Sequence, residues 1–176
     1  MTEPAAPAAR RRPRTAAETV PPPAAPAPSG DPAVPYLLDF YPREGPSETR
    51  LTRFFETLRR GRLSTTRCRR DGALLWPPRL ACPRCHTSDL EWIDLPGTGH
   101  VYAFSAVLAG APLGMERDVP LVVGLVDLDG VPMRIFGRIV GRPWTECRVG
   151  LPVTVEPFDV PGGRVFYRFR ATPSDA

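Results

Sequence analysis

Four residues between Cys68 and Cys85 have the types and the spacing needed to bind a metal ion. Cys82 and Cys85 form a C-x2-C pair, which places two thiolates on one tight turn, close enough to share a metal. Cys68 and Asp71 repeat this spacing with a carboxylate in place of the second thiolate, and Gly72 follows, where a knuckle turn favours glycine. The pattern predicts a structural zinc site of the ribbon type, formed by Cys68, Asp71, Cys82 and Cys85.

The carboxylate changes what we expect of this site. Asp71 offers a harder ligand than a thiolate, so zinc should bind more weakly than it would to four cysteines. His86 is an alternative fourth ligand, although adjacent residues rarely reach one metal with good geometry. A redox pair at Cys82 and Cys85, or a ribbon that packs without metal, are the other interpretations. Cys147 is remote in sequence, and we expect it to be a small buried apolar residue.

A helix is predicted just before the metal-binding region, over residues 47–62. Ser47 is a suitable N-cap, and Gly61 is a suitable stop after two arginines in the last turn. Four apolar residues recur at i, i+3, i+4 and i+7, which places them on one face. These are Leu51, Phe54, Phe55 and Leu58. The face either packs on the protein's own domain or docks a partner.

The zinc ribbon is predicted over residues 63–96. The region that follows it, residues 97–171, favours β-structure. Five β-rich stretches within residues 97–171 are separated by glycine, proline and Asp-Gly turns. Five short strands with glycines where a strand must bend predict a small closed barrel of the OB type, with a sandwich as the alternative. Tyr102 and Phe104 are expected on one face of their strand, and Tyr167 and Phe169 on the face opposite Phe166.

The N-terminal region has a different composition from the rest of the 176 residues. Twelve of the 24 prolines lie in residues 1–46, mixed with alanine and few large apolar residues. Such a segment cannot bury enough surface to offset the entropy of ordering, so it predicts a disordered leader. No continuous apolar core of a signal peptide or membrane span is found, and we expect a cytoplasmic location. Residues 172–176 are expected to form a short tail.

The net charge of +4 comes from one part of the chain. Residues 47–96 contain ten arginines and six acidic residues, whereas residues 97–176 contain eight of each. Six arginines in the basic segment could contact an acidic partner or the phosphates of CoA, with a solvated surface as the alternative. They are Arg59, Arg60, Arg62, Arg69, Arg70 and Arg79.

The order of these features resembles a known family. The stretch FFETLRRGRL is followed by CRRDG, PPRLACPRC and LEWIDLPGTGHVYAFSAV. This order is similar to the acyl-CoA-associated zinc-ribbon/OB-fold family, formerly catalogued as a domain of unknown function. The resemblance covers residues 51–169 and is most specific at Trp92, Gly97 and Gly99, followed by the aromatic strand. It implies a rubredoxin-like zinc ribbon and an OB barrel. Asp71 departs from the family pattern, which has cysteine there.

The resemblance also implies a function. Members of the family are auxiliary subunits of thiolase-fold enzymes, including thiolases, lipid-transfer-protein-like aldolases, ketosynthases and acyltransferase relatives, and some accompany hotdog-fold hydratases. It therefore implies a non-catalytic subunit that supports an enzyme acting on acyl-CoA or acyl-carrier substrates, and sometimes binds acyl-CoA. No catalytic residue carries over.

Two other functions remain possible from the residues alone. Zinc ribbons and OB folds also bind single-stranded nucleic acid, but the neutral barrel region argues against a basic binding face. An independent enzyme would need a constellation of catalytic groups. His86 and His100 are the only histidines, and neither lies in a recognisable nucleophile or base pattern.

Overall fold

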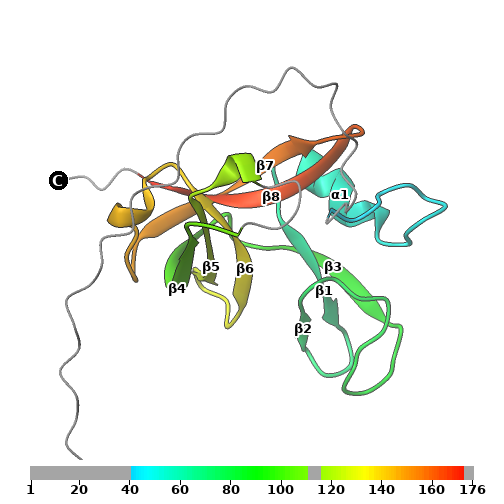
Figure 1. Cartoon of the computed structure of the whole chain (residues 1–176). Helices are drawn as coiled ribbons and strands as arrows, with labels where there is room; N and C mark the ends of the chain where they lie inside the picture. Colours follow the sequence, from blue (N-terminus) through cyan, green and yellow to red (C-terminus); the bar gives the residue numbers. More distant parts are fainter. Residues whose placement is uncertain (1–40, 111–115, 173–176) are drawn as a thin grey trace, which may run out of the picture. The chain divides into compact units, whose positions relative to one another are not determined.

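The computed structural model describes residues 41–110 and 116–172 (Figure 1). Within these ranges the chain forms a short helix, a three-stranded sheet and a closed five-stranded barrel, in that order. The predicted fold class, mainly β with an N-terminal helix, a ribbon and an OB-type barrel, is therefore confirmed. Among these residues, no helix has the length and apolar character needed to cross a membrane.

The barrel contains the five strands that the sequence predicts. They are β4 (Thr98–Val107), β5 (Leu121–Leu128), β6 (Arg134–Val140), β7 (Pro152–Val160) and β8 (Arg164–Ala171). Their spatial order is β4-β5-β6-β8-β7, with β7 returning to β4. Neighbours pair antiparallel except β6 and β8, whose short parallel pairing places Ile139 opposite Phe169. This contact between distant segments closes the barrel and excludes an open sandwich.

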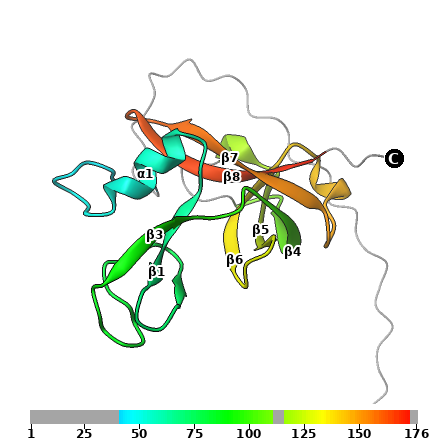
Figure 2. The same cartoon turned by 180° about the vertical axis from the view of Figure 1, so that it is seen from behind.

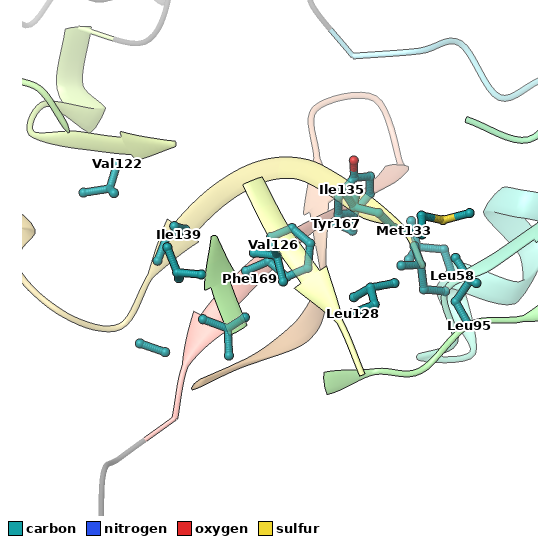
Figure 3. Close-up of a cluster of buried hydrophobic side chains, with 14 of the residues drawn as sticks. Leu58, Leu95, Val122, Val126, Leu128, Met133, Ile135, Ile139, Tyr167 and Phe169 are labelled. Atoms are coloured by element: carbon teal, nitrogen blue, oxygen red, sulfur yellow. The ribbon is translucent and has the colours of Figure 1, made fainter. Parts of the chain in front are cut away.

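Burial along the barrel strands follows the two-residue period of a half-buried sheet. In β8, Val165, Tyr167, Phe169 and Ala171 are buried, as the alternation predicts. Figure 3 shows this core, with Leu58 and Leu95 near Met133 at one end of the cluster. The same cluster includes residues of the helix, the ribbon and the barrel, so one core stabilises all three.

One expectation about strand faces is wrong. Tyr102 and Phe104 were expected on one face of β4, but the pairing with β5 shifts register between Val101 and Ala103. This bulge changes the alternation locally. Tyr102 is therefore 44% exposed, whereas Phe104 packs against the core.

Two glycines on β5 and β6 lie where a side chain would clash with neighbouring atoms: Gly124 faces the Ala103 carbonyl and Ile139, and Gly137 faces the Phe169 ring. Gly124 lies opposite Gly137 in the antiparallel pairing. A Cβ at Gly137 would lie 2.7 Å from the Phe169 ring, which is fully buried, so no larger residue fits there without movement. The glycines in β5 and β6 thus serve close packing inside the barrel.

The helix α1 (Thr52–Arg59) is shorter than the predicted range of 47–62. Leu51 is at its N-cap without a side-chain capping bond, so the prediction that Ser47 caps the helix is wrong. The chain before it forms a separate turn, in which the Glu48 and Thr49 amides both donate to the Gly45 carbonyl. The predicted stop at Gly61 is confirmed by its positive φ of 79°.

Of the predicted leader, residues 1–46, only residues 41–46 lie within the described ranges. Tyr41 packs edge-on against the rings of Phe158 and Phe166, with centroids 6.0 and 5.5 Å apart. The Glu44 carboxylate accepts hydrogen bonds from the Val165 amide and from Arg59. These six residues therefore connect the helix to the barrel hairpin of β7 and β8. Of the predicted tail, only residue 172 is described.

The ribbon sheet has the strand order β2-β1-β3 and lies between α1 and the barrel in the sequence. Its strands are β1 (Ser64–Cys68), β2 (Leu74–Leu75) and β3 (Leu90–Asp94), all antiparallel. Figures 1 and 2 show that the connection between β1 and β2 and the longer loop between β2 and β3 project from one end of this sheet. Cys68, at the end of β1, and three residues of these loops, Asp71, Cys82 and Cys85, are the four predicted metal ligands.

Candidate metal centre and interaction surfaces

The structure brings the four predicted metal ligands together. One ligand atom from each of Cys68, Asp71, Cys82 and Cys85 lies within 4.8 Å of the other three. The Cys68 and Cys85 sulfurs are 3.5 Å apart, and the Cys82 sulfur is 3.4 Å from Asp71 Oδ2. This is the only such cluster of three or more histidine, cysteine or acidic side chains among residues 41–110 and 116–172.

Local turn chemistry explains why the first pair converges. The Gly72 amide donates to the Cys68 carbonyl at 2.9 Å, and Gly72 has a positive φ of 71°. The Asp71 side chain accepts a hydrogen bond from the Ala73 amide at 3.0 Å, which closes an Asx turn. Asp71 thus stabilises its own turn with one oxygen and directs the other toward Cys82.

The second pair lies on a matching turn. The His86 amide donates to the Cys82 carbonyl at 3.0 Å, and the Arg84 amide donates to the Cys82 sulfur at 3.4 Å. His86 has a φ of 59°, in the left-handed region where the corresponding turn of the other arm uses glycine. Its side chain is exposed and does not belong to the four-ligand cluster, so the alternative of His86 as fourth ligand is wrong in this arrangement.

The protonation of the cluster differs from residue to residue. The Ala73 amide lowers the pKa of Asp71 to about 2, so this carboxylate is ionised at neutral pH. The Cys85 backbone amide lowers the pKa of Cys82, whereas burial raises the pKa of Cys68 to about 11. Without a metal, Cys68 therefore stays protonated. A metal that binds all four ligands must displace at least one proton.

The residues fit a zinc ion. With Zn–S bonds of about 2.3 Å and a Zn–O bond of about 2.0 Å, tetrahedral coordination separates two sulfurs by about 3.8 Å and a sulfur from an oxygen by about 3.5 Å. The observed separations of 3.5 and 3.4 Å are close to these values. The donor set of three thiols and one carboxylate also suits zinc better than calcium or magnesium, which prefer oxygen ligands.

Cys147 lies apart from this centre, as the sequence predicts. It is 8% exposed and belongs to the barrel core cluster, whereas Cys68 and Cys82 form a separate cluster with Leu75. Burial raises the pKa of the Cys147 thiol. It therefore behaves as a small core residue.

The apolar face of α1 packs on the chain's own core. Phe54, Phe55 and Leu58 are 6, 5 and 0% exposed and belong to the central cluster. Of the two interpretations of this face, packing on its own domain is the one these three residues show. Leu51, at the start of the helix, remains half-buried.

An apolar groove of about 340 Å³ nevertheless begins at this face. Leu51, Phe54 and Phe55 line one side of it. Aromatic residues of the ribbon and of the barrel also line it, namely Trp76, Phe136, Phe166 and Tyr167, together with Pro42, Arg43, Thr49, Pro77 and Pro78. Phe136 is 58% exposed, which is unusual for a phenylalanine, and it shares the outward face of β6 with Arg134.

Tyr167 fixes the backbone beneath this exposed ring. Its hydroxyl donates to the Phe136 carbonyl at 2.7 Å, and burial raises its pKa above the ordinary range. Because this bond joins the Tyr167 side chain of β8 to the backbone of β6, it holds Phe136 at the edge of the groove. No sequence signal indicated this pairing, since the two residues are far apart in the chain.

The six predicted anion-contacting arginines fall into two groups. Three pair with acidic residues of the chain: Arg59, Arg62 and Arg69. The other three form no ion pair within the part of the chain that the structure describes: Arg60, Arg70 and Arg79. Glu44 was missed by the sequence analysis, yet its side chain is only 6% exposed where it pairs with Arg59.

Tyr102 is an exposed aromatic residue of the barrel that could stack a nucleic acid base, but its ring is already covered. The Arg134 guanidinium lies 3.6 Å from the centroid of Tyr102 and also donates to Asp127 at 2.8 Å. A base would have to displace this arginine from both partners. The arrangement therefore gives little support to base stacking at Tyr102.

Two family models match adjacent parts of the chain. Residues 55–91 match the rubredoxin-like zinc ribbon domain of ChsH2, and residues 92–156 match its C-terminal OB-fold domain. Together they cover the ribbon, part of the helix and most of the barrel.

Named relatives and one solved structure are similar over the same region. The DUF35 domain-containing scaffold protein of Methanocaldococcus jannaschii is 34% identical over 49% of this chain and 61% of its own length. The 3-oxo-4,17-pregnadiene-20-carboxyl-CoA hydratase alpha subunit of Mycobacterium tuberculosis is 33% identical over 76% of this chain and 42% of its own. The chain thus spans less than two thirds of either relative. A chain of the Ltp2-ChsH2(DUF35) aldolase superposes with a TM-score of 0.60 at 27% identity, covering 72% of this chain and 98% of that one.

Proposed function

Because the chain belongs to the family of ChsH2-type zinc-ribbon and OB-fold domains, we propose that it is a non-catalytic auxiliary subunit that supports an enzyme acting on acyl-CoA or acyl-carrier substrates. The observation that carries this proposal is the likeness to a chain of the Ltp2-ChsH2(DUF35) aldolase, 98% of which is covered. The relatives named as a scaffold protein and as a hydratase alpha subunit support the same role.

The partner that we propose is a thiolase-fold enzyme, such as a thiolase, an aldolase or a ketosynthase. The aldolase named in the structural match supports this choice. A hotdog-fold hydratase is the alternative, which the hydratase alpha subunit supports. Either partner would contribute the catalytic groups, and this chain would contribute a binding surface.

We place the docking surface at the apolar groove beside α1. Of the four residues of the predicted docking face, Leu51, Phe54 and Phe55 line the groove. Leu58 does not, because it is fully buried. Phe136 is the natural anchor, since a large aromatic ring that is more than half exposed gains most from burial in an interface. An apolar segment of the partner enzyme would fill the space between this ring and the helix.

The metal has a structural role in this proposal. Zinc held by Cys68, Asp71, Cys82 and Cys85 would cross-link the loop after β1 to the loop before β3. All four positions of a tetrahedral ion would then be occupied by protein atoms, which is typical of structural rather than catalytic zinc. The ribbon would in turn hold Trp76, which lines the groove.

The experiment that tests this function is a tagged pull-down from the native host, with identification of the bound proteins by mass spectrometry. We expect an acyl-CoA enzyme in stoichiometric amount with the wild-type chain. Phe136→Asp should lose it while the melting temperature stays within a few degrees. Val149→Asp is the matched control, because Val149 is also exposed (66%) but does not line the groove.

Two results would contradict the proposal. Recovery of nucleic acid that survives moderate salt, with no acyl-CoA enzyme, would favour the single-stranded nucleic-acid alternative. Equal loss of the enzyme in Phe136→Asp and Val149→Asp would remove the groove as the docking surface.

A further inference from the structure

A polar hollow of about 420 Å³ lies on the other side of the helix from the apolar groove. Arg53, Glu56, Thr57 and Arg60 line it from α1, and their spacing of i, i+3, i+4 and i+7 places them on one helix face. Arg62, Trp92 and Asp94 line the opposite wall, where β3 of the ribbon passes. The hollow is therefore built from two separate elements and not from one helix surface.

The charges in this hollow are unbalanced. Arg62 donates to Asp94 at 2.6 Å, so this pair is internally satisfied. Arg53 and Arg60 form no ion pair with any acidic group in the described ranges, even though Glu56 lies between them on the same face. Two guanidinium groups thus face the hollow, and no carboxylate within residues 41–110 and 116–172 pairs with them. Guanidinium groups bind phosphate oxygens with paired, charge-assisted hydrogen bonds.

Arg53 and Arg60 are separated by two helical turns, about 10 Å along the axis. Their long side chains can converge on one phosphate or bind two phosphates of one ligand. A ligand with two separated phosphate groups matches this spacing better than a single inorganic ion.

Trp92 supplies the second feature of the hollow. Its ring is half-buried, and the Arg53 guanidinium lies 5.9 Å from its centroid, near the outer limit of a cation–π contact. This contact is much looser than the 3.6 Å stacking of Arg134 on Tyr102. A planar base can therefore approach the Trp92 ring without breaking a tight contact, and such stacking is favourable for any base.

Neither Arg70 nor Arg79 offers the same combination. Both lack an ion pair within the described part of the chain, but neither lines the polar hollow or the apolar groove. The hollow is thus the place where unpaired positive charge, an aromatic face and a concave surface coincide.

We infer that the hollow between α1 and β3 binds a phosphorylated ligand with a planar base, with Arg53 and Arg60 on the phosphates and Trp92 on the base. The 3′-phosphorylated adenosine diphosphate end of CoA has this chemistry, and its choice as the source rests on the proposed function. A free nucleotide has the same chemistry. Of the six arginines predicted to contact an anion, this inference assigns phosphate binding to Arg60. It adds Arg53, which the sequence did not single out.

The test is a calorimetric titration of the full chain with adenosine 3′,5′-bisphosphate at low ionic strength. We expect saturable binding that weakens as salt is added, and adenosine without phosphate should bind at least tenfold more weakly. Arg53→Gln and Arg60→Gln should each weaken binding about tenfold, because each removes a charge-assisted contact. Arg79→Gln is the control and should leave the affinity unchanged. Both tested arginines are exposed, so the melting temperature should not change.

The ring contact has its own test. Trp92→Phe keeps an aromatic face and should retain affinity within a few fold. Trp92→Leu should weaken the affinity about tenfold. In both variants, the bisphosphate should still bind more tightly than adenosine without phosphate. No binding at millimolar ligand, or equal losses in Arg60→Gln and Arg79→Gln, would overturn the inference.

Two further arms separate the ligand source and the proposed function. If CoA binds as tightly as the bisphosphate and at least tenfold more tightly than ATP, CoA is the source; equal binding of ATP would overturn CoA as the source. The second arm combines this titration with the pull-down of the wild-type chain. If the partner enzyme is recovered but the wild-type chain binds no nucleotide, the inference fails and the proposed function stands. Nucleotide binding without any acyl-CoA enzyme would support the site and contradict the proposed function.

Discussion

The sulfur atoms of Cys68 and Cys85, which belong to different arms of the ribbon, lie 3.5 Å apart. Cys68 ends β1, and Cys85 lies in the loop before β3, so 16 residues of chain separate them. Their approach shows that the ribbon sheet brings both half-motifs to one point. The same arrangement places Asp71 beside Cys82. Each of the four ligands therefore lies next to a ligand from the other arm of the ribbon.

The first prediction concerns metal content. Cys82→Ser should abolish stoichiometric zinc, because a serine hydroxyl is a poor ligand, and should lower the melting temperature. Cys147→Ser should retain zinc, since Cys147 lies in the barrel core. The measurement is elemental analysis of the purified chain by mass spectrometry. Equal zinc in the two variants would show that the cluster is not the metal site.

A second prediction concerns the departure from four cysteines. Asp71→Cys should strengthen zinc binding at least tenfold, because a thiolate is a softer ligand for this ion. The rate and extent of zinc loss to a chelator measure the effect. Asp71→Asn keeps the size of the side chain but removes the charge, and it should lose zinc faster than the wild type. An Asp71→Cys variant that releases zinc as fast as the wild type would argue that Asp71 is not a ligand.

The helix gives a third prediction, about stability. Leu58→Ala should lower the free energy of unfolding by about 2–5 kcal/mol, because Leu58 is fully buried and its removal leaves a cavity. Leu80→Ala is the matched control: Leu80 is 42% exposed, and its loss should change stability by less than about 0.5 kcal/mol. Urea unfolding measures both. A small effect of Leu58→Ala would mean that α1 does not pack on the barrel in solution.

A fourth prediction concerns pH. Glu156 accepts hydrogen bonds from Arg168 and Arg170, both at 2.8 Å, and these arginines lower its pKa from 4.5 to about 2. A lowered carboxyl pKa stabilises the folded state above the unfolded value, so this contribution is present above pH 4.5 and is lost as the pH falls from about 4.5 to 2. Solvent screens these half-exposed groups, so the contribution should be on the order of 1 kcal/mol.

Glu156→Gln should therefore flatten the dependence of stability on pH over that range, as measured by urea unfolding at pH 5 and pH 3. Glu56→Gln is the control, because Glu56 is exposed and forms no ion pair with a described residue. A wild type and a Glu156→Gln variant that lose equal stability between the two pH values would contradict the role of this pair.

Much of the fold could be predicted because it depends on local spacing. The C-x2-C turn and its Cys-to-Asp counterpart each close within a few residues, so the sequence alone identified all four residues of the cluster. Alternation along β8 likewise predicted that Tyr167 and Phe169 face the core. The helix was predicted in position but not in length, since the turn at Gly45 competes with an earlier start.

What only the tertiary structure decided depends on contacts between distant segments. Alternation along β6 places Phe136 on the same face as Arg134 and Arg138, but it could not show that Phe136 borders a groove together with α1 and Trp76. Composition placed Glu44 in the leader, yet its side chain is only 6% exposed where its carboxylate meets Arg59 and the Val165 amide. The pairing of Arg53 with Trp92 across the hollow also needs the helix and the ribbon to be placed together. Sequence spacing fixes which side chains share a turn or a face, whereas the closure of the barrel and the packing of α1 determine which of those faces meet solvent.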